Sequence, residues 1–170
     1  MIVAEKHLWL IRHAKASAHG RPDHGRELAY RGYRQCVEMG QFLSTVSQPP
    51  TIFLTSDARR TYTTAHVLNA FVGDEVVPVG DMYTYDVDVL ASAVETVMEK
   101  FGLDGVNGLA VVGHNSAISD LVAELTHKSS TPSLPTLGMA ELVFNGEWNE
   151  LWQRVPISLR RLETPSARTK

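Results

Sequence analysis

The feature that most constrains the fold is a regular alternation of short apolar runs with longer amphipathic stretches. The apolar runs, rich in branched and aromatic residues, predict strands over residues 7–11, 51–56, 73–80 and 108–114. The stretches with apolar residues at three- and four-residue spacing predict helices over residues 33–46, 57–71, 87–102 and 115–127. Strands that alternate with helices are typical of a parallel sheet covered on both faces. We therefore expect an α/β fold: a three-layer α/β/α sandwich with a mainly parallel central sheet.

The C-terminal part of the chain has a different pattern. The sequence MAELVF-NG-EWNELWQ, residues 139–153, indicates a hairpin of two strands joined by an Asn-Gly turn. We expect a single domain over residues 1–163 and an unstructured tail over residues 164–170. The chain shows no internal repeat and no linker-like segment.

The composition of the chain argues against several classes of function. The 170 residues carry a formal net charge of −3, which gives no reason to expect a nucleic-acid or membrane partner, so any anion site must be a local cluster. The longest apolar runs fall far short of the ~20 residues of a membrane span. Cys36 is the single cysteine, which excludes an internal disulfide and a cysteine-rich metal site. We expect a cytoplasmic protein that needs no metal or other cofactor.

Unusual polar residues follow three of the predicted strands. Arg12 and His13 end the first strand, the sequence TSDARRT with Arg60 ends the second, and His114 follows the fourth. Ligands bind at the carboxyl ends of strands in sheets of this kind, so these side chains should meet at one edge. Arginine forks and helix N-termini favour phosphate oxygens, and a histidine among cations is held neutral. A neutral imidazole can attack phosphorus.

The stretches LIRHAKAS, TSDARRTYTTA and VVGHNSAISDLVAEL together resemble the histidine phosphatase superfamily, which includes the phosphoglycerate mutases. The family's arginine-histidine-glycine signature reads Arg12-His13-Ala14 here, with alanine in place of glycine. The short chain, RHAKAS and DHGRELAYRG are most similar to the SixA branch of phosphohistidine phosphatases. The resemblance implies a phosphoglycerate mutase-like fold.

The resemblance also implies roles for individual residues. His13 matches the nucleophile that becomes phosphohistidine, and Arg12 matches the arginine beside it. Counting from Ser56, the phosphate-binding arginine falls on Arg60 rather than Arg59. His114 matches the second histidine, which contacts a phosphoryl oxygen. We interpret Arg59 as part of a solvated helix face.

Further residues are assigned to the site on weaker grounds. The general acid of many members follows the third strand, where Asp81 is the nearest match and Asp86 its rival; a member without a clear acid is the third alternative. Arg26 resembles a recurrent arginine of this branch. Lys15 and Ser17, in the loop after the nucleophile, and Asn115, beside His114, are candidate substrate-binding residues.

These assignments predict a phosphatase that hydrolyses phosphohistidine or phosphomonoesters through a phosphohistidine intermediate on His13. Its partner would be a phosphorylated protein or a small phosphorylated metabolite. A small-molecule phosphatase or mutase of the same superfamily is the first alternative, and a non-catalytic phospho-binding module is the second. The oligomeric state is left open by the sequence.

Overall fold

The computed structural model describes residues 4–18 and 22–166. The strands are β1 (Glu5–Arg12), β2 (Ile52–Ser56), β3 (Glu75–Val79), β4 (Gly108–Gly113), β5 (Met139–Asn145) and β6 (Ser158–Glu163). The α-helices are α1 (Tyr30–Leu43), α2 (Arg59–Val72), α3 (Val87–Lys100) and α4 (Ala117–Leu125). Three short 3-10 helices are η1 (Asp23–Gly25), η2 (Gly80–Met82) and η3 (Trp148–Trp152).

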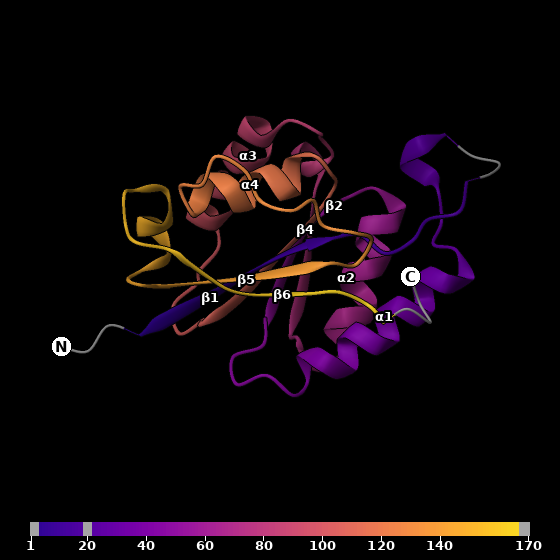
Figure 1. Cartoon of the computed structure of the whole chain (residues 1–170), viewed down its shortest axis with the longest axis horizontal. Helices are drawn as coiled ribbons and strands as arrows, with labels where there is room; N and C mark the ends of the chain where they lie inside the picture. The colour runs from indigo at the N-terminus through magenta and orange to yellow at the C-terminus, as the bar shows by residue number, and fades with distance from the viewer. Residues whose placement is uncertain (1–3, 19–21, 167–170) are drawn as a thin grey trace.

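All six strands form one sheet in the order β3-β2-β4-β1-β5-β6. Neighbouring strands are parallel from β3 to β1, while β5 runs antiparallel to β1 and β6 runs antiparallel to β5. Helices α3 and α4 lie on one face of the sheet and α1 and α2 on the other (Figure 1). The predicted three-layer fold with a mainly parallel sheet is confirmed.

The core is divided by the sheet into two apolar clusters. On β1, Leu8 and Leu10 join the cluster beneath α3 and α4, whereas Trp9 and Ile11 join the one beneath α1 and α2. This alternation follows from the two-residue period of a strand. Strand β4, in the middle of the parallel part, is buried along its whole length. Its continuous apolar sequence is the expected pattern for a strand covered on both faces.

The predicted C-terminal hairpin is wrong in its second strand. Residues 148–152 form η3, and the antiparallel partner of β5 is β6 instead. Two local features explain the difference. The side chains of Glu147 and Glu150 form a reciprocal capping box at the start of η3. Trp148 and Leu151, three residues apart, are both buried against the core, which a helical turn permits and an alternating strand does not.

Two predicted irregular segments are only partly described. The loop after β1 contains η1 and an isolated bridge between Ala16 and Leu28, and its residues 19–21 lie outside the described part. In the predicted tail, residues 164–166 form no helix or strand, and the backbone N–H of Ser166 donates to Glu38. Residues 167–170 of that tail also lie outside the described part. Among the residues described, none of the helices has the length and apolar character to cross a membrane.

Candidate active site

The ends of three parallel strands bring four of the predicted site residues to one pocket: Arg12, His13, Arg60 and His114. Strand β4 lies between β2 and β1, so His114, which follows β4, lies between the residues that follow its neighbours. A cavity of about 210 Å³ at this edge is lined by Arg12, His13, Lys15, Ala16, Arg26, Arg60, Tyr85, His114, Asn115 and Thr136. The ring centroids of His13 and His114 are 5.4 Å apart. The four residues that carry the family resemblance therefore line one cavity.

The hydrogen bond of His13 defines its tautomer. Nδ1 lies 2.7 Å from the carbonyl oxygen of Ala14, and because a carbonyl can only accept, Nδ1 carries the proton. The lone pair of a neutral ring then resides on Nε2. The backbone N–H of His13 also donates to the Gly113 carbonyl on β4, at 3.1 Å, which ties the end of β1 to its neighbour. The ring of His13 is thus fixed with its unprotonated nitrogen at Nε2.

Burial and surrounding cations keep both histidines neutral. Burial lowers the pKa of His13 to about 4, and the guanidinium of Arg60 acts in the same direction. Burial likewise lowers the pKa of His114 to about 3, with further repulsion from His13 and Arg60. His114 Nδ1 lies 3.3 Å from Nη2 of Arg60, which can only donate, so Nε2 carries the proton toward Ser56 Oγ at 2.9 Å. At neutral pH both rings are uncharged imidazoles.

Arg60 is almost completely buried, with 1% of its surface exposed. Its Nη1 donates to the backbone carbonyl of Asp23 at 2.8 Å and its Nη2 to the Asp23 carboxylate at 3.0 Å. The hydroxyl of Tyr83 donates to the same carboxylate. The Tyr83 hydrogen bond has the largest effect on the pKa of Asp23, and the Arg60 contact acts in the same direction. Together they hold this pKa well below its usual range. The two oxygens of Asp23 fix the orientation of the Arg60 guanidinium. Further N–H groups of the guanidinium stay available as donors.

Arg12 is held by the loop that precedes β5. Its Nη1 donates to the Leu134 carbonyl at 3.0 Å, and its buried Nε has no partner within the described residues. Asn115 secures the same loop, because its Nδ2 donates to the Leu134 carbonyl at 2.8 Å and to Ser133 Oγ at 3.0 Å. The amide oxygen of Asn115 accepts from Ser119. The amide of Asn115 therefore joins the loop to α4 at the pocket wall.

The charge of the lining favours an anion. Four lining side chains, from Arg12, Lys15, Arg26 and Arg60, are cationic, and the lining residues include no carboxylate. Lys15 and Arg26, both predicted to bind substrate, are among them. Ser17 is not part of the lining; its backbone carbonyl accepts from Arg26 Nη1 at 3.3 Å. Arg59 forms an ion pair with Glu27 at 3.0 Å on the half-exposed face of α2.

The two predicted acids lie away from this pocket. Asp81, in η2, is exposed and lines a separate shallow depression with residues of α3. Asp86 is the N-cap of α3, where its Oδ1 accepts from the backbone N–H groups of Asp88 at 2.8 Å and Val89 at 3.1 Å. Neither carboxylate is among the lining residues.

Several supporting residues were not predicted. Asp23 and Tyr83 hold Arg60, and the exposed ring of Tyr85 forms part of the lining. Thr64 Oγ1 accepts from the backbone N–H of Ala14 at 3.0 Å. Gln35, fully buried, accepts from the backbone N–H of Lys15 at 2.9 Å. In the sequence, Asp23 appears only as part of a polar loop, and Gln35 and Thr64 appear only as polar residues on helical stripes. Neither pattern by itself indicates a site.

Comparison with solved structures supports the fold assignment. A protein from Nakamurella multipartitia named as a candidate phosphohistidine phosphatase SixA superposes with a TM-score of 0.77 at 23% identity, over 98% of this chain and all of its own. The protein histidine phosphatase SixA in complex with tungstate gives 0.76 at 17% identity, over 94% and 97% of the two chains. A candidate α-ribazole-5′-P phosphatase from Escherichia coli K-12 gives 0.68 at 17% identity, over 94% and 97%.

These similarities establish a phosphoglycerate mutase-like fold. A search of curated proteins found no match. The family model of the histidine phosphatase superfamily (branch 1), in contrast, matches residues 8–102, which include Arg12, His13 and Arg60. The chain belongs to the histidine phosphatase superfamily, branch 1.

Proposed function

We propose that the protein is a phosphatase that hydrolyses phosphohistidine or phosphomonoesters through a phosphohistidine intermediate on His13. The observation that carries this proposal is the orientation of His13. Its Nδ1 proton is engaged by the Ala14 carbonyl, and the ring lies in a pocket lined by Arg12, Arg60 and His114. A neutral nucleophile surrounded by anion-binding groups is what phosphoryl transfer requires.

The first step would be attack by His13 Nε2 on phosphorus. A bond from Nε2 to phosphorus forms as the bond from phosphorus to the leaving nitrogen or oxygen breaks. Arg12 and Arg60 would hold the equatorial oxygens, and these fixed donors stabilise the charge of the transition state. In the second step a water molecule attacks the phosphorylated His13, which releases inorganic phosphate and restores Nε2.

The chemistry of the leaving group favours phosphohistidine over alkyl phosphomonoesters as the substrate. An alkoxide needs a proton as it departs, and the pocket lining includes no carboxylic acid to supply it. Imidazole and aryl oxides are better leaving groups and depend less on a general acid. Phosphohistidine is therefore the substrate class that this pocket fits best, in line with the names of the SixA relatives.

A small phosphate ester is the alternative substrate. The similarity to a protein named as an α-ribazole-5′-P phosphatase favours it, and so does the modest pocket of about 210 Å³. A mutase of the same superfamily and a non-catalytic phospho-binding module are the remaining alternatives. Turnover assays on an alkyl phosphate and on a phosphohistidine protein, run side by side, distinguish the two substrate classes, because only the alkoxide needs a proton as it departs.

The intermediate itself can be tested by brief labelling and quenching. We expect an acid-labile, base-stable phosphate on the wild-type protein and none on His13→Gln. The matched control is His66→Gln, because His66 is exposed on α2 and stacks on Tyr62 outside the pocket. Turnover by His13→Gln at the wild-type rate would exclude His13 as the nucleophile. Phosphate binding without label or turnover would identify a binding module.

A further inference from the structure

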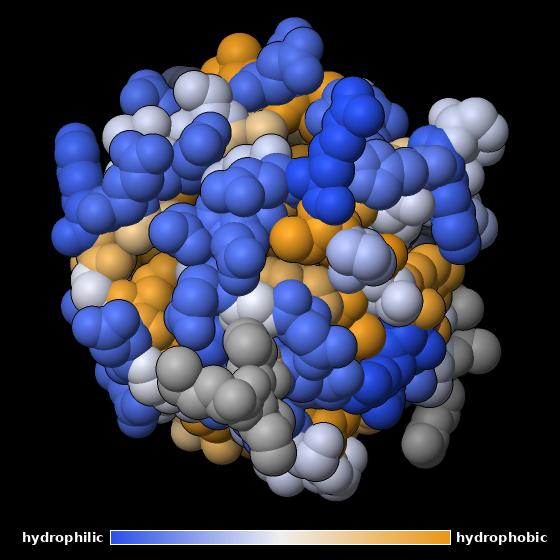
Figure 2. Space-filling model, turned by 90° about the vertical axis from the view of Figure 1, so that its left-hand side faces the viewer, coloured by the Kyte–Doolittle hydropathy of each residue, from blue (hydrophilic) through white to orange (hydrophobic). Residues whose placement is uncertain are grey.

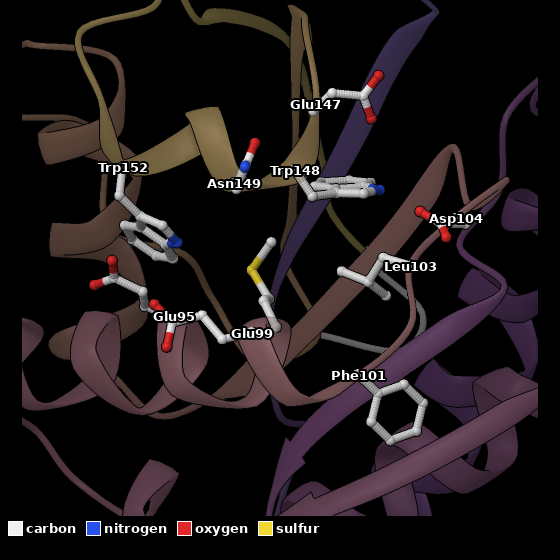
Figure 3. Close-up of a pocket in the computed structure, with 10 residues that line it drawn as sticks. Glu95, Glu99, Phe101, Leu103, Asp104, Glu147, Trp148, Asn149 and Trp152 are labelled. Carbon is white, nitrogen blue, oxygen red and sulfur yellow. The ribbon is translucent and has the colours of Figure 1, made fainter.

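A second and larger cavity lies at the opposite end of the sheet from His13. Its volume is about 340 Å³, and it is formed by the last turns of α3, the loop that follows and η3 (Figure 3). Helix α3 starts beside the active-site pocket, close to Tyr85, and its C-terminus is joined through residues 101–107 to the start of β4. The cavity therefore belongs to a different surface from the catalytic pocket.

Two indole rings form walls of this cavity. Trp148 is fixed, because its Nε1 donates to the Val106 carbonyl at 2.7 Å and its ring meets Phe144 edge-on at 5.6 Å. Trp152 has no hydrogen-bond partner for Nε1 in the part of the chain that the structure describes, so only packing holds its ring. Met98 and Leu103 are buried apolar residues of the same lining. The cavity thus has aromatic walls.

Carboxylates surround these walls on two sides. Glu95 and Glu99 come from one face of α3, and Asp104 and Glu147 come from the two loops on the other side (Figure 3). The lining includes no lysine or arginine. Within residues 4–18 and 22–166, no ion pair neutralises Glu95, Glu99 or Asp104.

This arrangement costs free energy in the empty protein. Like charges four residues apart on a helix, such as Glu95 and Glu99, repel each other. Figure 2, which shows this end of the molecule, displays apolar surface between hydrophilic side chains. A guest that covers the apolar walls and places positive charge at Glu95 and Glu99 on one side and at Asp104 on the other would relieve both costs.

We propose that this cavity binds an aliphatic polyamine. Ammonium groups are attracted to the face of an indole ring and to carboxylates, and the methylene chain between them can cover Met98 and the tryptophans. Because the carboxylates lie on two sides, a guest with a cation at each end matches them better than a single ammonium group. A hard divalent ion would match the carboxylates and leave the aromatic walls unused.

Calorimetric titration of the full chain with spermidine at low salt tests the proposal. We expect one spermidine to bind per chain, and Glu95→Gln/Glu99→Gln to weaken binding about tenfold, since two charge contacts are lost. Trp152→Leu keeps an apolar wall without an indole face and should weaken binding as well. Diaminopentane should bind more tightly than diaminoethane, because only the longer chain spans the cavity.

The matched control removes the same charge elsewhere. Asp74→Asn/Glu75→Gln neutralises two exposed carboxylates at the start of β3 and should leave spermidine binding unchanged. Equal weakening in the control pair and in the Glu95/Glu99 pair would show diffuse counterion binding and overturn the proposal. Displacement of spermidine by Mg²⁺ at matched ionic strength would also overturn it. A lysine peptide that binds where diamines do not would identify a protein partner instead.

Discussion

The carboxylate of Asp23 accepts a hydrogen bond from Nη2 of Arg60 at 3.0 Å, while the carbonyl of Asp23 accepts from Nη1 at 2.8 Å. Asp23→Ala removes the first contact and keeps the second. We expect kcat/KM on p-nitrophenyl phosphate to fall about fivefold, because a charge-assisted bond to a partly exposed partner contributes about 1 kcal/mol. The loss should reside mainly in KM, since Arg60 would bind the phosphoryl group in a less fixed orientation.

Asp23→Asn is the control for this variant. It retains an oxygen that can accept from Arg60, so its kcat/KM should lie between those of the wild type and Asp23→Ala. The carboxylate also accepts from Tyr83, Tyr85 and Arg26, so Tyr83→Phe removes only one of these other donors and should leave Arg60 in place. An Asp23→Ala protein with wild-type KM would show that the backbone carbonyl of residue 23 and the surrounding packing hold Arg60 without the carboxylate.

The titration of His13 provides a second prediction. Its folded-state pKa of about 4 lies below the ordinary value of 6.5, so the unfolded chain binds the proton first as the pH falls. The neutral ring therefore contributes stability above pH 6.5, and that contribution declines as the pH falls from 6.5 toward 4. Urea unfolding between pH 7 and pH 5 should show a smaller decline in the His13→Gln/His114→Gln variant.

NMR titration of the His13 ring checks the same point directly. We expect a midpoint near pH 4 for the His13 ring. A midpoint for His13 near 6.5 would mean that the ring is not held neutral by its surroundings. The inferred nucleophile would then be partly protonated at neutral pH.

The sequence predicts the sheet and the site residues at its strand ends, because periodicity and strand-end position are local features. Arg12, His13, Arg60 and His114 follow strands whose parallel order brings them together. Asp23 could not be found in this way, since its contact with Arg60 spans 37 residues and depends on how a long loop folds. The hairpin prediction failed for a related reason: burial of Trp148 against the core outweighed a local turn signal.

Variants of Asp81 and Asp86, the two predicted acids, distinguish an effect on stability from an effect on activity. Asp86 caps α3 through two backbone N–H groups, so Asp86→Ala should lower the free energy of unfolding by about 1 kcal/mol and leave kcat unchanged. Asp81→Asn should change neither quantity, because Asp81 is exposed in η2 outside the pocket lining. Chemical unfolding measures the free energy of unfolding, and turnover of an alkyl phosphate measures kcat. A selective loss of alkyl phosphate turnover in Asp81→Asn would restore Asp81 as the general acid.

Thr64 connects the loop after His13 to helix α2. Its Oγ1 accepts from the Ala14 backbone N–H at 3.0 Å and donates to the Arg60 carbonyl at 2.7 Å. Thr64→Val keeps the shape but leaves the buried N–H of Ala14 unpaired, which should cost about 1–3 kcal/mol of stability. Thr64→Ser keeps the hydroxyl and should retain more activity than Thr64→Val. The opposite order, measured as kcat/KM, would show that the methyl group is what matters at this position.

Gly32 is the point where α1 approaches the loop after His13 most closely. A Cβ at this position would lie 2.2 Å from the backbone oxygen of Lys15, and Lys15 lines the pocket two residues after His13. Because backbone rather than a flexible side chain must move, Gly32→Ala should lower the free energy of unfolding by about 1–3 kcal/mol and reduce kcat/KM together. Gly102→Ala is the matched control, since no atom lies within 4 Å of its added Cβ. If Gly32→Ala is destabilised but retains full kcat/KM, the Lys15 segment tolerates displacement and contributes little to phosphate binding.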